Sequence, residues 1–451
     1  MSVSTSHPRL RLLPLLIAMG VGSMAVSVQA QSLVDLYTAA RGYDATYQSA
    51  KLQFDATRAK ADQAQALLLP TVGLSANINQ INQDTQAPAA AAKNYDYNSQ
   101  SATLGLSQPL YRPGNFASYE QGKKGAELAQ AQLAAAEQDL IVRVSQAYFD
   151  VLASSDTLEV VKTQKTAVGE QLASAKRNFE VGTSTITDSR EAQARYDLVV
   201  AQQLAAENDL MVKKLALNTV VGQANAQPKP LAVPVVLNGV QPADVALWVD
   251  QSQVNHPGVV QAELALQVAK LETAKAEAGH KPTLDLTASY TAAATNNGTS
   301  TAANIDTRGN QAAVGLSFNL PLFAGYAIQN RVKETVALEE KARTDLEAAR
   351  RNVAQATRTA YFGLQSGLAQ VSALQAAEAS SQSALDANKL GYQVGVRINI
   401  DVLNSQSQLF DTKAKLAKAR YDVLVGGLKL RQANGSLKAD DLQAINQQLV
   451  P

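Results

Sequence analysis

The sequence of 451 residues contains no cysteine and only three histidines, at His7, His256 and His280. The absence of cysteine excludes disulfides, thiolate metal sites and cysteine nucleophiles, and it also excludes a lipid-modified cysteine as a membrane anchor. Zinc and iron sites rely heavily on histidine and cysteine, so this composition argues against a metalloenzyme. We therefore expect a protein without a metal ion or other cofactor.

Aromatic residues make up only 5% of the chain, with a single tryptophan, and the formal net charge is +1. Proteins that bind nucleic acids present a basic surface or aromatic side chains on which bases stack, so we expect no nucleic-acid partner. The sequence also lacks the phosphate-binding pattern G-x-x-x-x-G-K-[ST] and the nucleophile pattern G-x-S-x-G. Without these patterns, an ATPase or a hydrolytic enzyme is not expected.

The N-terminal segment has the three parts of a secretory signal. Arg9 and Arg11 precede an apolar run over residues 12–26, and the sequence Val-Gln-Ala ends at Ala30. Because this run is short for a membrane-spanning helix, residues 1–30 are predicted to be a signal peptide, with an uncleaved anchor as the alternative. No later stretch reaches the ~18 apolar residues of a spanning helix. If the exported chain crosses a membrane, it must use strands.

Two halves of the chain repeat the same landmarks at a spacing of 212 or 213 residues. The repetition predicts a first repeat over residues 31–240 and a second over 241–451, with a proline-rich connector at 223–240. The matching pairs are Pro70 and Pro282, Pro109 and Pro321, Gly182 and Gly395, Asp188 and Asp401, and Gly222 and Gly435.

Each half contains long segments without proline that predict long helices. Residues 115–180 would extend about 100 Å as one helix, at a rise of about 1.5 Å per residue. Frequent alanine allows neighbouring helices to approach closely, so we expect helical hairpins packed side by side, as in coiled coils. The predicted helices cover residues 33–68, 115–180, 188–221, 245–280, 326–393 and 401–434.

Four other segments alternate apolar residues with small or polar ones. Val72, Leu74, Ala76 and Ile78, for example, are separated by Thr, Gly, Ser and Asn residues. A period of two with one apolar face predicts strands. Each half also contains a polar stretch that we expect to be a long surface loop. The predicted strands cover residues 70–81, 100–112, 282–292 and 310–323, and the predicted loops cover 82–99 and 292–309.

The number of strands bears on oligomeric state. Each strand has about the ten residues that a tilted strand needs to cross the hydrocarbon layer. Single-chain membrane barrels begin at about eight strands, so four membrane strands require a barrel shared between subunits, in a dimer or a trimer. The alternative is a soluble sheet that caps a helical bundle. With membrane strands, the long helices would extend on one side of the membrane as a tube. The alternative function is an exported structural or adaptor protein that uses the hairpins as a periplasmic spacer, without a pore.

The organisation resembles the TolC family of outer-membrane efflux and secretion channels. The resemblance covers about residues 32–449, and its most specific stretch is Gly-Tyr-Gln-Val-Gly-Val-Arg-Ile-Asn-Ile-Asp-Val-Leu at 391–403. Further matches are Ala-Arg-Tyr-Asp at 419–422 and Phe-Glu-Val-Gly at 179–182. Without an N-terminal cysteine, the chain fits the TolC-like branch better than the lipoprotein branch.

The resemblance implies a mainly α protein with a β-barrel portion, assembled as a homotrimer in the outer membrane of a Gram-negative bacterium. Twelve strands would form one barrel in the outer-membrane lipid, and twelve helices would form a periplasmic α-barrel. A periplasmic adaptor protein and an inner-membrane transporter, either a proton-driven pump or an ABC exporter, would dock at the hairpin end and open it. The protein would be the passive exit duct of a tripartite efflux pump or a type I secretion system.

The family's gating residues can be placed one by one. Tyr392 and Arg397 match the mobile hairpin, and Gln171, Thr187 and Asp188 match their partners on the outer hairpin. Hydrogen bonds and ion pairs among these residues would hold the periplasmic mouth closed.

Other residues at the hairpin ends carry more than one interpretation. Asp401 matches the first aspartate of an acidic ring at the closed mouth, which in the family implies selectivity for cations. The second ring position is Asn404 instead of aspartate, so the resemblance implies a weaker selectivity here. Asp188 and Asp401 could also simply cap helices, and Asp188 with Glu191 has the spacing of a capping box. Gly182 and Gly395 are interpreted as helix C-cap glycines in the hairpin turns.

Overall fold

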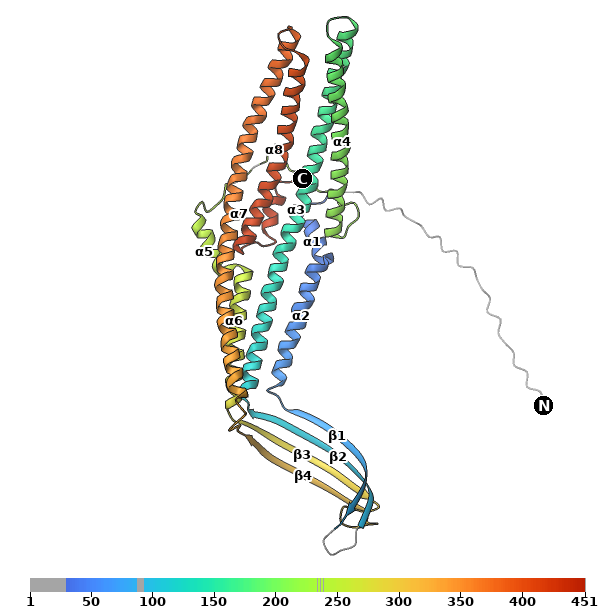
Figure 1. Cartoon of the computed structure of the whole chain (residues 1–451), viewed down its shortest axis with the longest axis vertical. Coiled ribbons are helices and arrows are strands. Elements are labelled where there is room, and N and C mark those ends of the chain that lie inside the picture. Colours follow the sequence, from blue (N-terminus) through green and yellow to red (C-terminus); the bar gives the residue numbers. More distant parts are fainter. Residues whose placement is uncertain (1–29, 87–92, 233, 236, 238, 451) are drawn as a thin grey trace, which may run out of the picture.

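The computed structural model describes residues 30–86, 93–232, 234–235, 237 and 239–450. The predicted signal peptide at 1–30 therefore lies almost wholly outside the described residues, as do parts of the connector. The molecule is elongated, with a helical bundle at one end and a four-stranded sheet at the other (Figure 1). This arrangement confirms the expected combination of long helical hairpins and a small β portion.

The first half contributes four helices and two strands. The predicted helix over 33–68 is wrong as a single element, because it is divided at Asp44. The Asp44 carboxylate accepts a hydrogen bond from the Tyr47 amide at 2.8 Å and caps the second helix, while Arg143 holds the same carboxylate at 2.8 Å. The helices are α1 (Leu33–Tyr43), α2 (Ala45–Ala66), α3 (Pro113–Glu180) and α4 (Ile186–Val221).

The second half repeats this plan. His256 divides the segment predicted as one helix over 245–280, since Pro257 has no amide hydrogen to continue the first helix and instead begins the next. The His256 Nδ1 accepts a hydrogen bond from the Gly258 amide at 3.0 Å. The elements are α5 (Val245–Asn255), α6 (Pro257–Glu277), η1 (Ala278–His280), α7 (Ala327–Gln393), α8 (Asn399–Asn434) and α9 (Asp441–Asn446).

The four strands form one antiparallel sheet in the order β1-β2-β3-β4. β1, β2 and β3 are longer than predicted, whereas β4 begins three residues earlier and ends at Asn319 instead of 323. The expected loop over 82–99 is therefore mostly strand, and the expected loop over 292–309 is shortened to residues 297–306. Backbone pairing continues through polar residues because ladder hydrogen bonds do not depend on side-chain polarity. The strands are β1 (Thr71–Thr85), β2 (Lys93–Tyr111), β3 (Thr283–Asn296) and β4 (Thr307–Asn319).

Strand register gathers the apolar side chains on one face of the sheet. Residues that lie directly opposite one another in neighbouring strands point to the same face. Several of these side chains are well exposed in the single chain, including Leu74 at 76% and Val314 at 79%. Two apolar rows cross all four strands, one of Leu74, Leu104, Tyr290 and Ala312 and one of Val72, Leu106, Ala288 and Val314. The sheet therefore presents a continuous apolar surface.

An ion pair joins the sheet to the helical bundle. Arg112 lies between β2 and α3, and its Nε and second terminal nitrogen lie 2.7 and 2.5 Å from the two carboxylate oxygens of Asp285 in β3. Asp285 is 7% exposed and the Arg112 side chain is 43% exposed, so this two-point contact is partly shielded from water. The contact fixes the direction in which α3 leaves the sheet.

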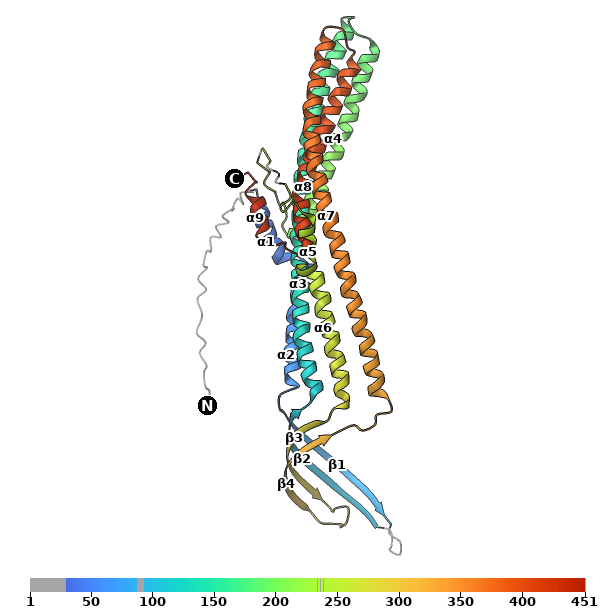
Figure 2. The same ribbon diagram turned by 90° about the vertical axis from the view of Figure 1, so that its left-hand side faces the viewer.

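The main hydrophobic core lies halfway along the bundle. Phe149 of α3 stacks on Tyr421 of α8 with 5.7 Å between ring centroids. The buried Tyr148 hydroxyl donates to the Lys229 carbonyl oxygen of the connector at 2.8 Å. Short β-bridges join Gln31 to Pro228 and Leu231 to Leu449, so the connector binds both ends of the described chain beside α1 and α9 (Figure 2). In the part of the chain that the structure describes, no helix combines the length and apolar character needed to cross a membrane.

Candidate functional site at the hairpin tips

The two long hairpins end together, far from the sheet (Figures 1 and 2). Gly182 follows α3 and Gly395 follows α7, each with φ of +78°, in the left-handed region that favours glycine. The Thr183 amide donates to the Asn178 carbonyl at 2.8 Å, and the Val396 amide donates to the Gly391 carbonyl at 2.9 Å. These bonds satisfy carbonyls at both helix ends, as in Schellman turns.

Asp188 stabilises the turn between α3 and α4, but not in the predicted way. The helix begins two residues earlier than expected, so Thr185 is the N-cap and Asp188 completes the capping box, which corrects the assignment of Asp188 with Glu191. The pKa of Asp188 lies below its ordinary value, first because the Ser184 hydroxyl donates to Oδ2 at 2.6 Å and then because the Thr185 amide and hydroxyl donate to it.

Tyr392 and Arg397 make different contacts from those that the sequence suggested. The Tyr392 hydroxyl accepts a hydrogen bond from Asn178 Nδ2 of α3 at 3.3 Å. Arg397 lies 3.6 Å from the Asp401 carboxylate in its own hairpin, and its side chain is 57% exposed. Thr187 is also exposed. Within one chain the described contacts therefore join Arg397 to Asp401 rather than to Thr187 or Asp188.

Gln171 is tied to the second hairpin through Asn399, a residue that the sequence analysis did not single out. Gln171 Nε2 donates to Asn399 Oδ1 at 2.5 Å, and Asn399 Nδ2 donates to the Asp188 carbonyl oxygen at 3.4 Å. The repeat contained a signal for this residue. Asn399 corresponds to Ile186 in the first half, so it is a polar replacement at an apolar position.

Asn404 also has a partner on the first hairpin. A terminal nitrogen of Arg195 in α4 donates to Asn404 Oδ1 at 2.9 Å. At the position of the second acidic ring, the chain therefore has an amide that is paired with the Arg195 cation, in place of a carboxylate. The described side chains include no cluster of three or more histidine, cysteine, aspartate or glutamate residues that could hold a metal ion.

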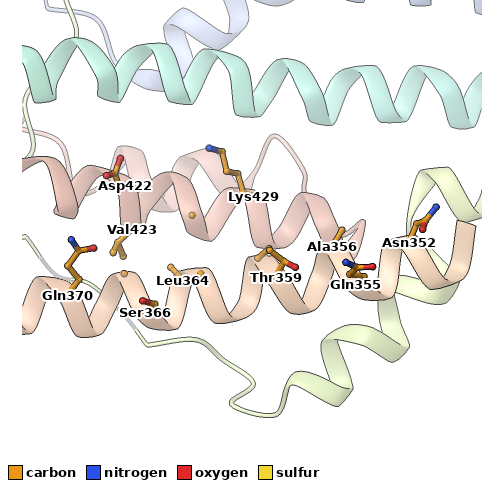
Figure 3. Close-up of a pocket in the computed structure, with 14 residues that line it drawn as sticks. Asn352, Gln355, Ala356, Thr359, Leu364, Ser366, Gln370, Asp422, Val423 and Lys429 are labelled. Atoms are coloured by element: carbon orange, nitrogen blue, oxygen red, sulfur yellow. The ribbon is translucent and has the colours of Figure 1, made fainter.

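Further along the second hairpin, α7 and α8 enclose an open groove of about 800 Å³ (Figure 3). Small residues form one part of its lining, here called the floor, beside larger residues such as Gln355 and Leu364: Ala356, Ala360, Gly363 and Gly367 of α7, and Gly426 of α8. Figure 3 shows Thr359 of α7 and Val423 of α8 on neighbouring helices along this groove. The space over these small residues can admit large side chains from another helix.

Comparisons with known proteins agree with this architecture. The family model described as outer membrane efflux protein matches residues 36–223 and 248–436. The chain is 33% identical to the outer membrane protein TolC of Vibrio cholerae over 97% of this chain and 98% of that protein. It is 29% identical to the alkaline protease secretion protein AprF of Pseudomonas aeruginosa, over 92% of this chain and 87% of that protein.

Solved structures show the same fold. The crystal structure of the outer membrane protein VceC of Vibrio cholerae superposes with a TM-score of 0.76 at 18% identity, covering 90% of this chain and 96% of that one. Family and fold are those of channel proteins and not of enzymes. The two segments matched by the family model each contain one long hairpin, as expected for a duplicated channel subunit. The chain therefore belongs to the outer membrane efflux protein family, as a passive exit duct that lies in the outer membrane and extends into the periplasm.

Proposed function

We propose that three copies of the chain form one duct that is closed at its periplasmic end by the hairpin tips. The observation that carries this proposal is the open sheet with one apolar face. In the described sheet β1 pairs only with β2, and β4 pairs only with β3. Unpaired strand edges are costly in lipid, so the edges of neighbouring copies must pair with each other. Three copies supply twelve strands and close the barrel.

Complementary surfaces on the helices support the same assembly. Leu204, Met211 and Leu215 of α4 are 63%, 70% and 65% exposed and have no apolar cover in the single chain. The repeat spacing places their equivalents in the second half at residues 417, 424 and 428 of α8. This part of α8 overlaps the part that lines the α7–α8 groove, so the exposed side chains of α4 and the groove lie at the same height along the bundle. Large side chains on one lateral face and a floor of small residues on the other therefore lie at the same level. Repeating this contact around an axis would produce a closed ring.

The mouth of the duct is assigned to the tips of the hairpins. Gln171, Tyr392 and Asp188 contribute to contacts between the two hairpins of one chain. Arg397 and Thr187 are exposed there and are available to a neighbouring copy. Asp401 and Asn404 would face the narrowest part of the opening, with one carboxylate ring in place of two.

The chain has no nucleotide-binding pattern, so the energy for transport must come from other proteins. We assign this role to an inner-membrane transporter and a periplasmic adaptor that contact the hairpin tips. The matching family is described as outer membrane efflux protein, and AprF is named as an alkaline protease secretion protein, so both small compounds and proteins of a type I system are candidate cargo. Residues 1–30 are proposed to direct export and then to be removed.

Conductance of the purified protein in a planar bilayer tests the closed duct. We expect a small conductance for the unaltered protein and a several-fold larger one for Tyr392→Phe combined with Arg397→Ser, because the variant loses polar contacts at the mouth. The matched control is Tyr43→Phe with Arg58→Ser, which changes exposed residues of α1 and α2 in the same chemical way.

The outcomes separate three functions. A small conductance that rises only in the tip variant supports the gated duct. A large conductance that neither variant changes would reveal an open pore and contradict the gating residues. Absence of conductance from folded protein would favour a periplasmic spacer without a pore.

Ion selectivity tests the assignment of Asn404. The variant Asn404→Asp should shift the zero-current potential only modestly toward cations, because Arg195 would pair with the new carboxylate at the mouth. Adding Arg195→Gln should produce a clearly larger shift, since the carboxylate then lacks its partner. Identical potentials for all three proteins in a potassium chloride gradient would mean that position 404 does not line the pore.

A further inference from the structure

Asn399 is a polar side chain at a buried position between the two hairpins. It is the first residue of α8 and is 1% exposed. Both ends of its amide have partners on the first hairpin: Oδ1 accepts from Gln171 of α3 at 2.5 Å, and Nδ2 donates to the Asp188 carbonyl of α4 at 3.4 Å. One side chain therefore joins the second hairpin to both helices of the first.

We propose that Asn399 is the positioning residue that holds the second hairpin against the first in the closed state of this chain. The start of α8 does not itself require asparagine at this place. The equivalent residue of α4 is Ile186, which begins a helix of the same length and is 49% exposed. The amide is thus explained by its contacts across the hairpins and not by local helix formation.

The surroundings of Asn399 make its hydrogen bonds costly to break. The apolar residues Leu172, Ala175, Ala192 and Leu403 form a buried cluster between the same three helices. A buried amide that loses its partner without gaining water is unfavourable, so separation of the hairpins must hydrate both Asn399 and Gln171. By contrast, the Arg397–Asp401 pair is largely exposed and stays within one hairpin, so it contributes little to this contact.

The inference rests on the proposed closed mouth, but its test measures the contact between the two hairpins and does not require conduction through a pore. The chain has no cysteine, so Ala175→Cys places a single thiol in the buried cluster. In the full-length protein this thiol should react slowly with a polyethylene-glycol maleimide. Adding Asn399→Leu should accelerate labelling by about tenfold or more, because the partly buried Gln171 amide loses its partner and is better hydrated when the hairpins separate.

A matched control is Asn388→Leu in the same cysteine background. Asn388 donates to Ser405 Oγ at 2.5 Å within the second hairpin. Its loss therefore removes a comparable hydrogen bond but no contact between the two hairpins. Labelling should remain slow in this variant. Since the labelling rate does not depend on conduction, a failure of the duct proposal and a failure of this inference give different results.

A second substitution guards against a folding defect at position 399. Gln171→Met removes the same hydrogen bond from the α3 side and should also accelerate labelling. Combining it with Asn399→Leu should add little to the faster of the two single variants, because both substitutions break one shared contact.

Three results would overturn the proposal. One is slow labelling in both the Asn399→Leu and Gln171→Met variants. Another is equal acceleration by Asn388→Leu. The third is fast labelling in the Ala175→Cys protein itself, which would mean that the contact does not hold the hairpins together.

Discussion

Gly435→Ala is expected to destabilise the folded protein by about 3 kcal/mol or more, since an alanine there combines left-handed backbone strain with an overpacked contact. Gly435 ends α8 with φ of +83°. A Cβ atom at this position would lie 2.4 Å from the His256 Cα and 2.8 Å from the Asn255 carbonyl oxygen. Those atoms belong to the junction between α5 and α6, so the backbone of either segment would have to move. Thermal unfolding of the purified protein measures the loss.

Gly395→Ala is the matched control for this substitution. Gly395 has nearly the same conformation, with φ of +78°, but no atom lies within 4 Å of the position that its Cβ would take. We expect a cost of only about 1 kcal/mol, which is the usual penalty for a left-handed alanine. Equal losses of stability in the two variants would mean that the contact between α8 and the α5–α6 junction is not as close as described.

Gly363→Leu is expected to reduce the fraction of trimer by more than about tenfold while leaving the subunit folded, because one large side chain fills the groove in which we propose that the neighbouring copy packs. Gly363 lies in the floor of the α7–α8 groove, and within its own chain no atom lies within 4 Å of a Cβ built there. The substitution should also favour helix formation in α7. Electrophoresis of unheated samples measures the trimer, and circular dichroism checks the fold.

Gly42→Leu supplies the comparison for the groove. Gly42 is an exposed helical glycine in α1, also with no atom within 4 Å of a built Cβ. The control gains the same side chain and a similar helix propensity away from the groove, so it should remain trimeric. A trimer that survives Gly363→Leu would contradict the proposed contact between α4 of one copy and the α7–α8 groove of the next.

Much of the fold can be predicted from the sequence because it depends on local periodicity. Alternation over 70–81 indicates β1, and a long segment without proline indicates α3 to within two residues of its start at Pro113. Predictions that required knowledge of tertiary contacts were less accurate. The break at Asp44 depends partly on Arg143, which lies 99 residues away in the chain.

In the candidate site, the difference between what local sequence patterns predict and what depends on tertiary contacts is larger. The positions of Gly182 and Gly395 follow from the Val-Gly pairs that end both long helices. The partners of Tyr392 and Gln171 do not follow from any pattern, because Asn178 and Asn399 are separated from them by 214 and 228 residues. Family resemblance indicated the hairpin tips as the region of interest but not Asn178, Asn399 or Arg195.

By itself the sequence determined that this is a duplicated protein of long helices and four amphipathic strands, since repeats, prolines and side-chain periods are properties of the linear chain. The tertiary structure decided which residues join the hairpins. Whether an asparagine at a helix start is solvated or makes buried hydrogen bonds to another hairpin depends on which residues lie opposite it. For Asn399 that environment consists of Gln171 and the Asp188 carbonyl, which only the packing of α8 against α3 and α4 brings within hydrogen-bonding distance.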